Sequence, residues 1–190
     1  MNPAVLIVDM VKDNLKPEHS IAAQLRSIIP TLQRLVHEAR VRGYPIVFAC
    51  DSYLPDDFIF RGKMKPHSIK GTEGAQVIEE LSPQPTDLVL PKRRFSAFFG
   101  TGLEGTLRGW GVDTLAVGGV TTHVCVLTTA LDAISHDFRV FVLEDCCASH
   151  RSEIHQSTIE TYKGTPLEPL LQFLLLEDFL SLLASNSTSP

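Results

Sequence analysis

The chain has 190 residues, of which 44% are hydrophobic and 21% charged, and its formal net charge is −5 at pH 7. This length suits one domain that buries a full hydrophobic core. An acidic chain without a block of Lys or Arg is a poor binder of nucleic acid or anionic membranes, because both need a concentrated basic surface.

The sequence holds no apolar run of about 18 residues that could span a bilayer, and its first residues lack the basic segment of a signal peptide. Four cysteines occur, none of them in a CxxC pair, and two are adjacent. This spacing is a poor disulfide framework. We therefore expect reduced thiols in a cytoplasmic protein.

Short apolar runs alternate along the chain with segments of helical periodicity. Strands are predicted over residues 4–8, 45–49, 87–90, 114–117 and 140–143. Their nearly continuous apolar character suits strands that are buried on both faces of a parallel sheet. Helices are predicted over residues 20–43, 74–81, 102–110 and 124–136.

The first of these helices carries apolar residues at helical spacing, and Gly43 suits its C-terminal cap. Pro30 inside it indicates either a kink or a break into two helices. The C-terminal segment "LLQFLLLEDFLSLLAS" fits either one amphipathic helix or a strand around residues 172–175 followed by a short helix.

The alternation of strands and helices predicts a three-layer α/β/α Rossmann-like fold with a six-stranded, mainly parallel sheet and right-handed crossovers. We expect a single domain over residues 1–184 and a disordered tail over 185–190. The irregular stretch 51–72 is long enough to be a functional loop.

Ligands of open parallel sheets bind beyond the carboxyl ends of the strands. Asp9 follows the first predicted strand, Lys92 the third, and Cys125 lies in the turn after the fourth. A helix N-terminus and a nearby cation lower the pKa of a thiol, so Lys92 could activate Cys125 as a nucleophile. Asp9 could act as general base and then general acid, and the turn before Cys125 could offer N–H groups to an oxyanion.

Each of these residues also has a structural interpretation. Cys125 could be a small buried hydrophobe, Asp9 a helix cap, and Lys92 part of a solvated basic turn. Their coincidence at three strand ends favours the catalytic interpretation.

The segments "LIVDM", "KRRFSAF" and "VGGVTTHVCVLTTALDA" resemble the isochorismatase-like cysteine hydrolases, a superfamily of nicotinamidases, N-carbamoylsarcosine amidases and isochorismatases. The resemblance implies Cys125 as nucleophile, Asp9 as general acid/base and Lys92 as the cation that stabilises the thiolate. It also implies a cis peptide between Val120 and Thr121 that aims the N–H of Thr121, with that of Cys125, into an oxyanion hole. Family members commonly form homodimers or homotetramers, so we expect a homo-oligomer.

Nicotinamidases of the family bind a metal through an Asp-x-His pair and a later His. Asp51 and His67 match this pattern, but Tyr53 stands where the first His is expected. Two ligands form an incomplete zinc site, and Asp56 or Asp57 could supply a third. We therefore expect that no cofactor is required, with a divalent metal such as zinc as the alternative.

The family's isochorismatases lack the nucleophilic cysteine, so Cys125 favours cleavage of a C–N bond. The prediction is a cysteine-dependent amidohydrolase that cleaves a small amide or carbamoyl compound through a thioester and releases ammonia. The alternatives are a metal-assisted nicotinamidase and a non-catalytic binding or regulatory protein on the same fold. The expected substrate pocket includes Tyr53, Phe95, Phe98 and Thr122, with Phe58 or Phe60 from the long loop.

Overall fold

The computed structural model describes residues 1–186 and contains one sheet of six strands in the order β3-β2-β1-β4-β5-β6. Every neighbouring pair of strands is parallel, so the predicted fold class is confirmed. The strands are β1 (Pro3–Val8), β2 (Ile46–Asp51), β3 (Leu88–Lys92), β4 (Thr114–Val120), β5 (Arg139–Ala148) and β6 (Leu171–Leu174).

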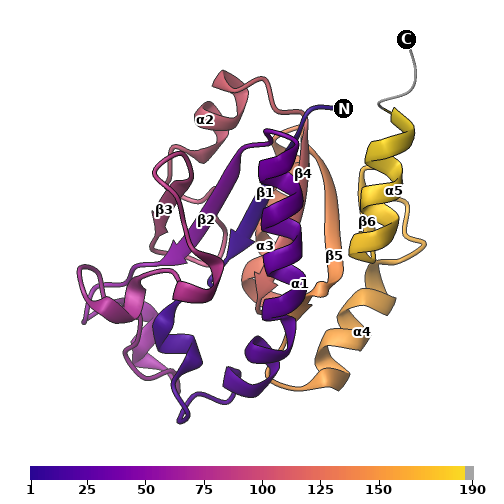
Figure 1. Ribbon diagram of the computed structural model, residues 1–190. Helices are drawn as coiled ribbons and strands as arrows, with labels where there is room; N and C mark the ends of the chain where they lie inside the picture. The colour runs from indigo at the N-terminus through magenta and orange to yellow at the C-terminus, as the bar shows by residue number, and fades with distance from the viewer. Residues whose placement is uncertain (187–190) are drawn as a thin grey trace.

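Helices cover both faces of this sheet, as Figure 1 shows. They are α1 (Ala22–Val41), α2 (Leu103–Gly109), α3 (Leu127–Ser135), α4 (Ser152–Tyr162) and α5 (Leu176–Asn186). Helices α1 and α5 pack into one hydrophobic core, whereas α2, α3 and α4 contribute to the core on the opposite face.

The central strand β1 explains why the strands read as continuous apolar runs. Side chains of a strand alternate between the two faces of the sheet. Val5 and Ile7 join the core under α1, and Leu6 and Val8 join the core on the other face. Because both faces are covered, every position of β1 is buried.

Helix α1 continues through Pro30 without a break, and Gly43 follows it with a φ of 69°. The C-terminal segment forms β6 followed by α5, so the single-helix interpretation is wrong. The carboxylate of Asp145 accepts the N–H of Leu176 at 2.9 Å, which helps to start α5 at that residue. Because α5 runs through Asn186, the predicted tail begins inside the helix, and its residues 187–190 lie outside the described part.

The helix predicted over residues 74–81 is wrong. Two short 3-10 turns occupy Glu73–Ala75 and Glu79–Leu81, with extended backbone between them. There Val77 forms an antiparallel bridge with Val11, and the N–H of Ile78 donates to the carbonyl of Met10 at 3.0 Å. These long-range hydrogen bonds outweigh the local helical preference.

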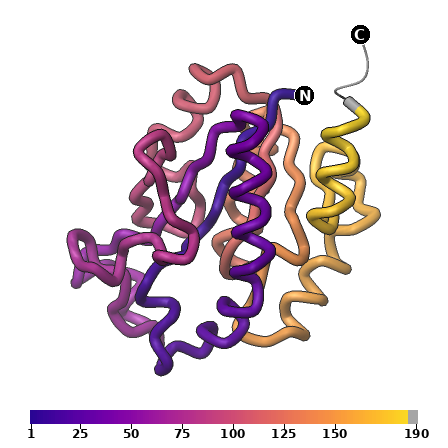
Figure 2. Tube along the Cα trace, viewed as in Figure 1, coloured from indigo at the N-terminus to yellow at the C-terminus, as the bar shows by residue number. Residues whose placement is uncertain are grey.

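The long connection between β2 and β3 leaves the sheet and forms an irregular lobe, visible beside the sheet in Figure 2. Besides the two 3-10 turns described above, it contains a third at Phe58–Arg61 and a parallel bridge between Tyr53 and Ile69. Across the described residues, no helix combines the length and apolar character needed to cross a membrane.

Candidate active site

Four polar side chains meet at the carboxyl ends of the strands. Asp9 directly follows β1, Asp51 ends β2, and Lys92 ends β3. Cys125 lies in a single π-helical turn, Thr122–Val126, that joins β4 to α3. Since these strands are neighbours in the sheet, the side chains converge on one edge, at the point where the strand order reverses.

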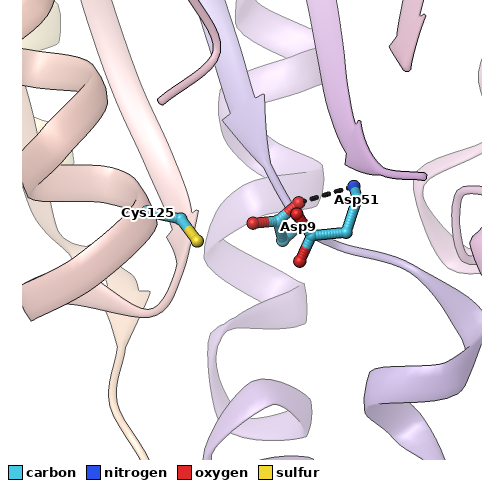
Figure 3. Close-up of side chains that lie close together, drawn as sticks. All are labelled: Asp9, Asp51 and Cys125. Carbon is cyan, nitrogen blue, oxygen red and sulfur yellow. Dashed lines mark hydrogen bonds between the residues drawn. The ribbon is translucent and has the colours of Figure 1, made fainter. Parts of the chain in front are cut away.

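Asp9 is held in place by its backbone and by one of its carboxylate oxygens. Its φ of 54° lies in the left-handed region, and its N–H donates to the carbonyl of Ala49 at 2.8 Å. Its Oδ1 accepts the N–H of Asp51 at 2.8 Å, and the side chain of Asn14 donates to its carbonyl at 2.9 Å. The other oxygen, Oδ2, lies 2.8 Å from the ammonium nitrogen of Lys92. Figure 3 shows the carboxylate oxygen that is not bonded to Asp51 pointing toward the sulfur of Cys125.

Lys92 is fully buried and supplies the cation of the site. Its Nζ lies 2.8 Å from Oδ2 of Asp9 and donates to Oδ1 of Asp51 at 2.5 Å. A third bond, at 3.1 Å, goes to the carbonyl of Arg94. Asp51 and Lys92 are direct register partners of β2 and β3, which explains why their side chains meet. Asp51 is thus part of the ionic cluster.

Cys125 is 8% exposed, and its sulfur lies within 4.8 Å of carboxylate oxygens of both Asp9 and Asp51. The strand before it approaches β1 closely, because Gly119 lies at an irregularity in the register of β4. Its φ is 119°, and a Cβ at this position would lie 2.0 Å from the carbonyl oxygen of Val8. The next peptide bond, Val120–Thr121, is cis. A glycine is therefore required for β4 to bring the turn with Cys125 against Asp9.

The electrostatics of the site differ from the prediction made from the sequence. Burial, followed by the charge of Asp51, raises the pKa of Asp9 to about 7. Burial and then the charge of Asp9 raise the pKa of the Cys125 thiol. Burial works to lower the pKa of Lys92, but the negative groups around it raise that pKa above its usual value.

The role of Lys92 as the cation that stabilises a thiolate on Cys125 stays a prediction. Lys92, whose ammonium group also contacts two carboxylates, works to lower the pKa of the Cys125 thiol, but burial and the charge of Asp9 outweigh it. The arrangement instead fits a protonated thiol beside a carboxylate that changes its charge near neutral pH. Such a pair can transfer the thiol proton at the moment of attack.

A cavity of about 130 Å³ opens in front of these groups. Most of the predicted site residues line it. The lining consists of Asp9, Asn14, Ile21, Asp51, Tyr53, Met64, His67, Phe95, Val120, Thr121, Val124 and Cys125.

Three aromatic or hydroxyl side chains that we predicted for the pocket lie elsewhere. Phe98 is buried in the core, where its ring stacks on His136 at 5.2 Å. Thr122 is also buried, and its Oγ1 lies 2.8 Å from Nδ1 of His155. Phe58 is 76% exposed.

Phe60 supports the cavity wall indirectly. Its ring packs edge-on against Tyr53 at 5.3 Å and against His67 at 5.8 Å. Nδ1 of His67 lies 2.9 Å from the carbonyl of Lys65, so this nitrogen carries the donated proton. The loop therefore presents Tyr53 and His67 to the cavity as one packed aromatic unit.

Asp9, Asp51 and Cys125 form the group of three potential metal ligands found among the described residues. Both of its carboxylates already contact the ammonium of Lys92, and it contains no imidazole. The Asp51 and His67 pair lacks a third ligand, because Asp57 is engaged by Arg93 at 2.5 Å and by the N–H of Leu54 at 2.8 Å. The donors present therefore do not fit a resident zinc ion.

The sequence analysis missed four residues of the cavity: Asn14, Ile21, Met64 and Val124. Val124 stands next to the predicted nucleophile, so its position could have been inferred. The other three come from loops on either side of the sheet, where neither periodicity nor strand ends provide a signal.

A search against protein-family models matches residues 3–169 to the Isochorismatase domain. A protein of Arabidopsis thaliana named "probable inactive nicotinamidase" is 35% identical over 86% of this chain and 89% of its own. The maleamate amidohydrolase of Pseudomonas putida is 28% identical over 83% of this chain and 77% of its own.

Solved structures share the same fold. An isochorismatase-like hydrolase from Alkaliphilus metalliredigens matches with a TM-score of 0.86 and 30% identity, over 96% of this chain and all of the other. N-carbamoylsarcosine amidase from Thermoplasma acidophilum matches with 0.79 and 31%, over 92% and 96% of the two chains. A pyrazinamidase of Pyrococcus horikoshii in complex with zinc matches with 0.81 and 26%, over 93% and 100%.

Proposed function

Because the chain belongs to the isochorismatase family and is a hydrolase of amide C–N bonds, we propose that it cleaves a small amide or carbamoyl compound through a thioester on Cys125. The observation that carries this proposal is that the buried side chains of Cys125 and Asp9 line one cavity, with the buried ammonium of Lys92 2.8 Å from Asp9. The product released in the first half of the reaction is ammonia.

In the first step, Oδ2 of Asp9 takes the proton of Cys125 while the sulfur attacks the amide carbon. An S–C bond forms and the carbonyl oxygen becomes an oxyanion. Asp9 then gives the proton to the nitrogen, the C–N bond breaks, and ammonia leaves. Water attacks the thioester with Asp9 again as base, and the proton returns to the sulfur as the acid product departs.

We assign the oxyanion to the backbone N–H groups of Thr121 and Cys125. Both residues line the cavity, and Thr121 directly precedes the π-helical turn that contains Cys125. Donors fixed by the backbone need no reorganisation as charge develops, which is why such sites stabilise the transition state strongly. Lys92 keeps Asp9 and Asp51 together, so that Asp51 sets the proton affinity of the base.

The test is ammonia release from a panel of small amides, including nicotinamide, N-carbamoylsarcosine and ureido acids. Cys125→Ala should lower kcat by at least about a thousandfold, as expected for the loss of a covalent nucleophile. Cys146→Ala is the matched control, because Cys146 is equally buried but packs in the core under α1. Equal activity of wild type and Cys125→Ala would contradict the mechanism.

A metal-assisted nicotinamidase is the second candidate, and it is favoured by the likeness to a zinc-bound pyrazinamidase. The donor set argues against the metal, as described above. Dialysis against a chelator separates the two candidates, because our proposal expects full activity of the dialysed protein. Loss of nicotinamide hydrolysis that zinc restores would favour the second candidate.

A non-catalytic binding protein is the third candidate, favoured by the relative named as inactive. It predicts no ammonia release from any amide and no change in ligand binding on Cys125→Ala. Trapping of a thioester on Cys125 by mass spectrometry after rapid acid quench would exclude it.

A further inference from the structure

A second and larger pocket adjoins the catalytic cavity. Its volume is about 650 Å³, and we call it the outer pocket. It shares Ile21, Met64, His67 and Thr121 with the catalytic cavity, so the two lie next to each other. The rest of its lining consists of Asp13, Lys16, Glu18, His19, Ser20, Lys63, Lys65, Pro66 and His150.

The catalytic cavity and the outer pocket differ in size, which indicates different roles in substrate binding. Small-molecule sites usually measure about 300–1,000 Å³. The catalytic cavity, at about 130 Å³, is below this range and holds only the reacting end of a substrate. A substrate larger than this cavity, with its amide carbon at Cys125, would therefore extend past His67 and Met64 into the outer pocket.

The charge of the outer pocket is opposite to that of the chain. Three lysines and three histidines line it with only two carboxylates, although the whole chain carries a net charge of −5. One carboxylate is already neutralised, because Asp13 lies 2.6 Å from Nζ of Lys16 and accepts the N–H of Ser68. Neither Lys63 nor Lys65 forms an ion pair with any described residue.

The segment that carries Lys63 and Lys65 is held in a defined position. Asp13 is buried and bonds the backbone of Ser68, the residue after His67. Nδ1 of His67 donates to the carbonyl of Lys65, and the His67 ring packs on Tyr53 at 5.5 Å. The segment that carries Lys63 and Lys65 is thus tied to the catalytic cavity by contacts of its own backbone.

We propose that the outer pocket binds a carboxylate, so that the natural substrate is an acidic amide: a primary amide or carbamoyl group joined by a short chain to a carboxylate. This inference rests on the proposed amidohydrolase function and specifies its substrate class. The amide enters the catalytic cavity, and the carboxylate lies near Lys63 and Lys65. Steering by these cations also raises the local concentration of anionic substrates.

The test compares acidic amides with neutral isosteres in which a methyl ketone replaces the carboxylate. Succinamate is paired with 4-oxopentanamide and glutaramate with 5-oxohexanamide, and ammonia release gives kcat/KM. The better acid should exceed its isostere by at least about fivefold, the size expected of one or two exposed ionic contacts. This preference should decrease as NaCl increases, because salt screens the attraction.

The double variant Lys63→Gln/Lys65→Gln should lower the preference for the acid to about twofold or less, mainly through KM. Lys70→Gln is the matched control, since Lys70 is exposed in the same loop but does not line either pocket. The carboxylate site would be overturned if acids and isosteres were hydrolysed equally well, or if the double variant kept the preference for the acid. Either result would leave the amidohydrolase function standing. Failure to hydrolyse any amide would overturn both.

Discussion

The Nζ atom of Lys92 lies 2.8 Å from Oδ2 of Asp9, and both side chains are at most 3% exposed. Asp51 shares the same ammonium, so one cation serves two carboxylates. The cluster with ionised carboxylates therefore carries an excess negative charge in a buried place. This imbalance raises the pKa of Asp9, and the pH behaviour of the protein follows from it.

The acid limb of the activity profile should have its midpoint near pH 7. Burial and the charge of Asp51 raise the pKa of Asp9 to about 7, and only ionised Asp9 can accept the thiol proton. We expect kcat/KM to rise between pH 5 and pH 8. Asp51→Asn removes a negative charge that raises the pKa of Asp9, so it should move the midpoint to lower pH. Measurement of both profiles on one substrate checks this, and a midpoint that Asp51→Asn leaves unmoved would contradict it.

The same shift predicts how folding stability depends on pH. The pKa of Asp9 in the folded state, about 7, is above its ordinary value of 3.8. The folded state therefore holds the proton more tightly, and the resulting stability is present at low pH and lost as pH rises through 7. Asp9→Asn cannot titrate. Relative to this variant, wild type should lose on the order of 3 kcal/mol of unfolding free energy from pH 4 to pH 8. Urea titrations at the two pH values measure the difference, and a constant difference would refute the prediction.

Removing Lys92 should lower the stability of the fold as well as the activity. Lys92→Met leaves two buried carboxylates without a cation, which typically costs about 3–5 kcal/mol. The double variant Lys92→Met/Asp51→Asn removes the ammonium together with one of its two carboxylates. It should recover part of the lost unfolding free energy, but not the activity. Lys70→Met, on the exposed loop, serves as the control. A double variant no more stable than Lys92→Met would show that the charges are not the cause.

Gly119 should tolerate no side chain. A Cβ there would lie 2.0 Å from the carbonyl oxygen of Val8, and the φ of 119° is unfavourable for alanine. We expect Gly119→Ala to lower the unfolding free energy by about 3 kcal/mol or more. Gly62→Ala has open space around the added methyl and should change it by less than about 0.5 kcal/mol. Thermal unfolding of the two variants compares them, and equal melting temperatures would contradict the steric argument.

Much of the fold could be predicted because the hydrophobic pattern reports burial directly. Strand β1 is apolar at each position since both of its faces are covered, and this also places Asp9 at a strand end. The catalytic trio follows from the same reasoning, because strand ends of a parallel sheet share an edge. The homo-oligomer and the cytoplasmic location stay predictions.

The errors come from contacts between distant segments. Val77 pairs with Val11 rather than forming a helix, and Phe98 packs on His136 rather than lining the cavity. The protonation of Cys125 could not be read from the sequence either. The raised pKa of its thiol comes first from burial and then from the charge of Asp9, which lies at the end of a different strand.

Strand β3 ends the sheet and pairs only with β2, and alternate residues along it are exposed or half-buried. The cation that contacts both buried carboxylates is therefore carried by an edge strand with a single neighbour. Edge segments open by local fluctuations at a lower free energy than the core. Amide hydrogens of β3 should accordingly exchange faster than those of β1 and β4. Each such opening would withdraw Lys92 from Asp9, so catalytic competence depends on the edge of the sheet as well as on the central strands before Asp9 and Cys125.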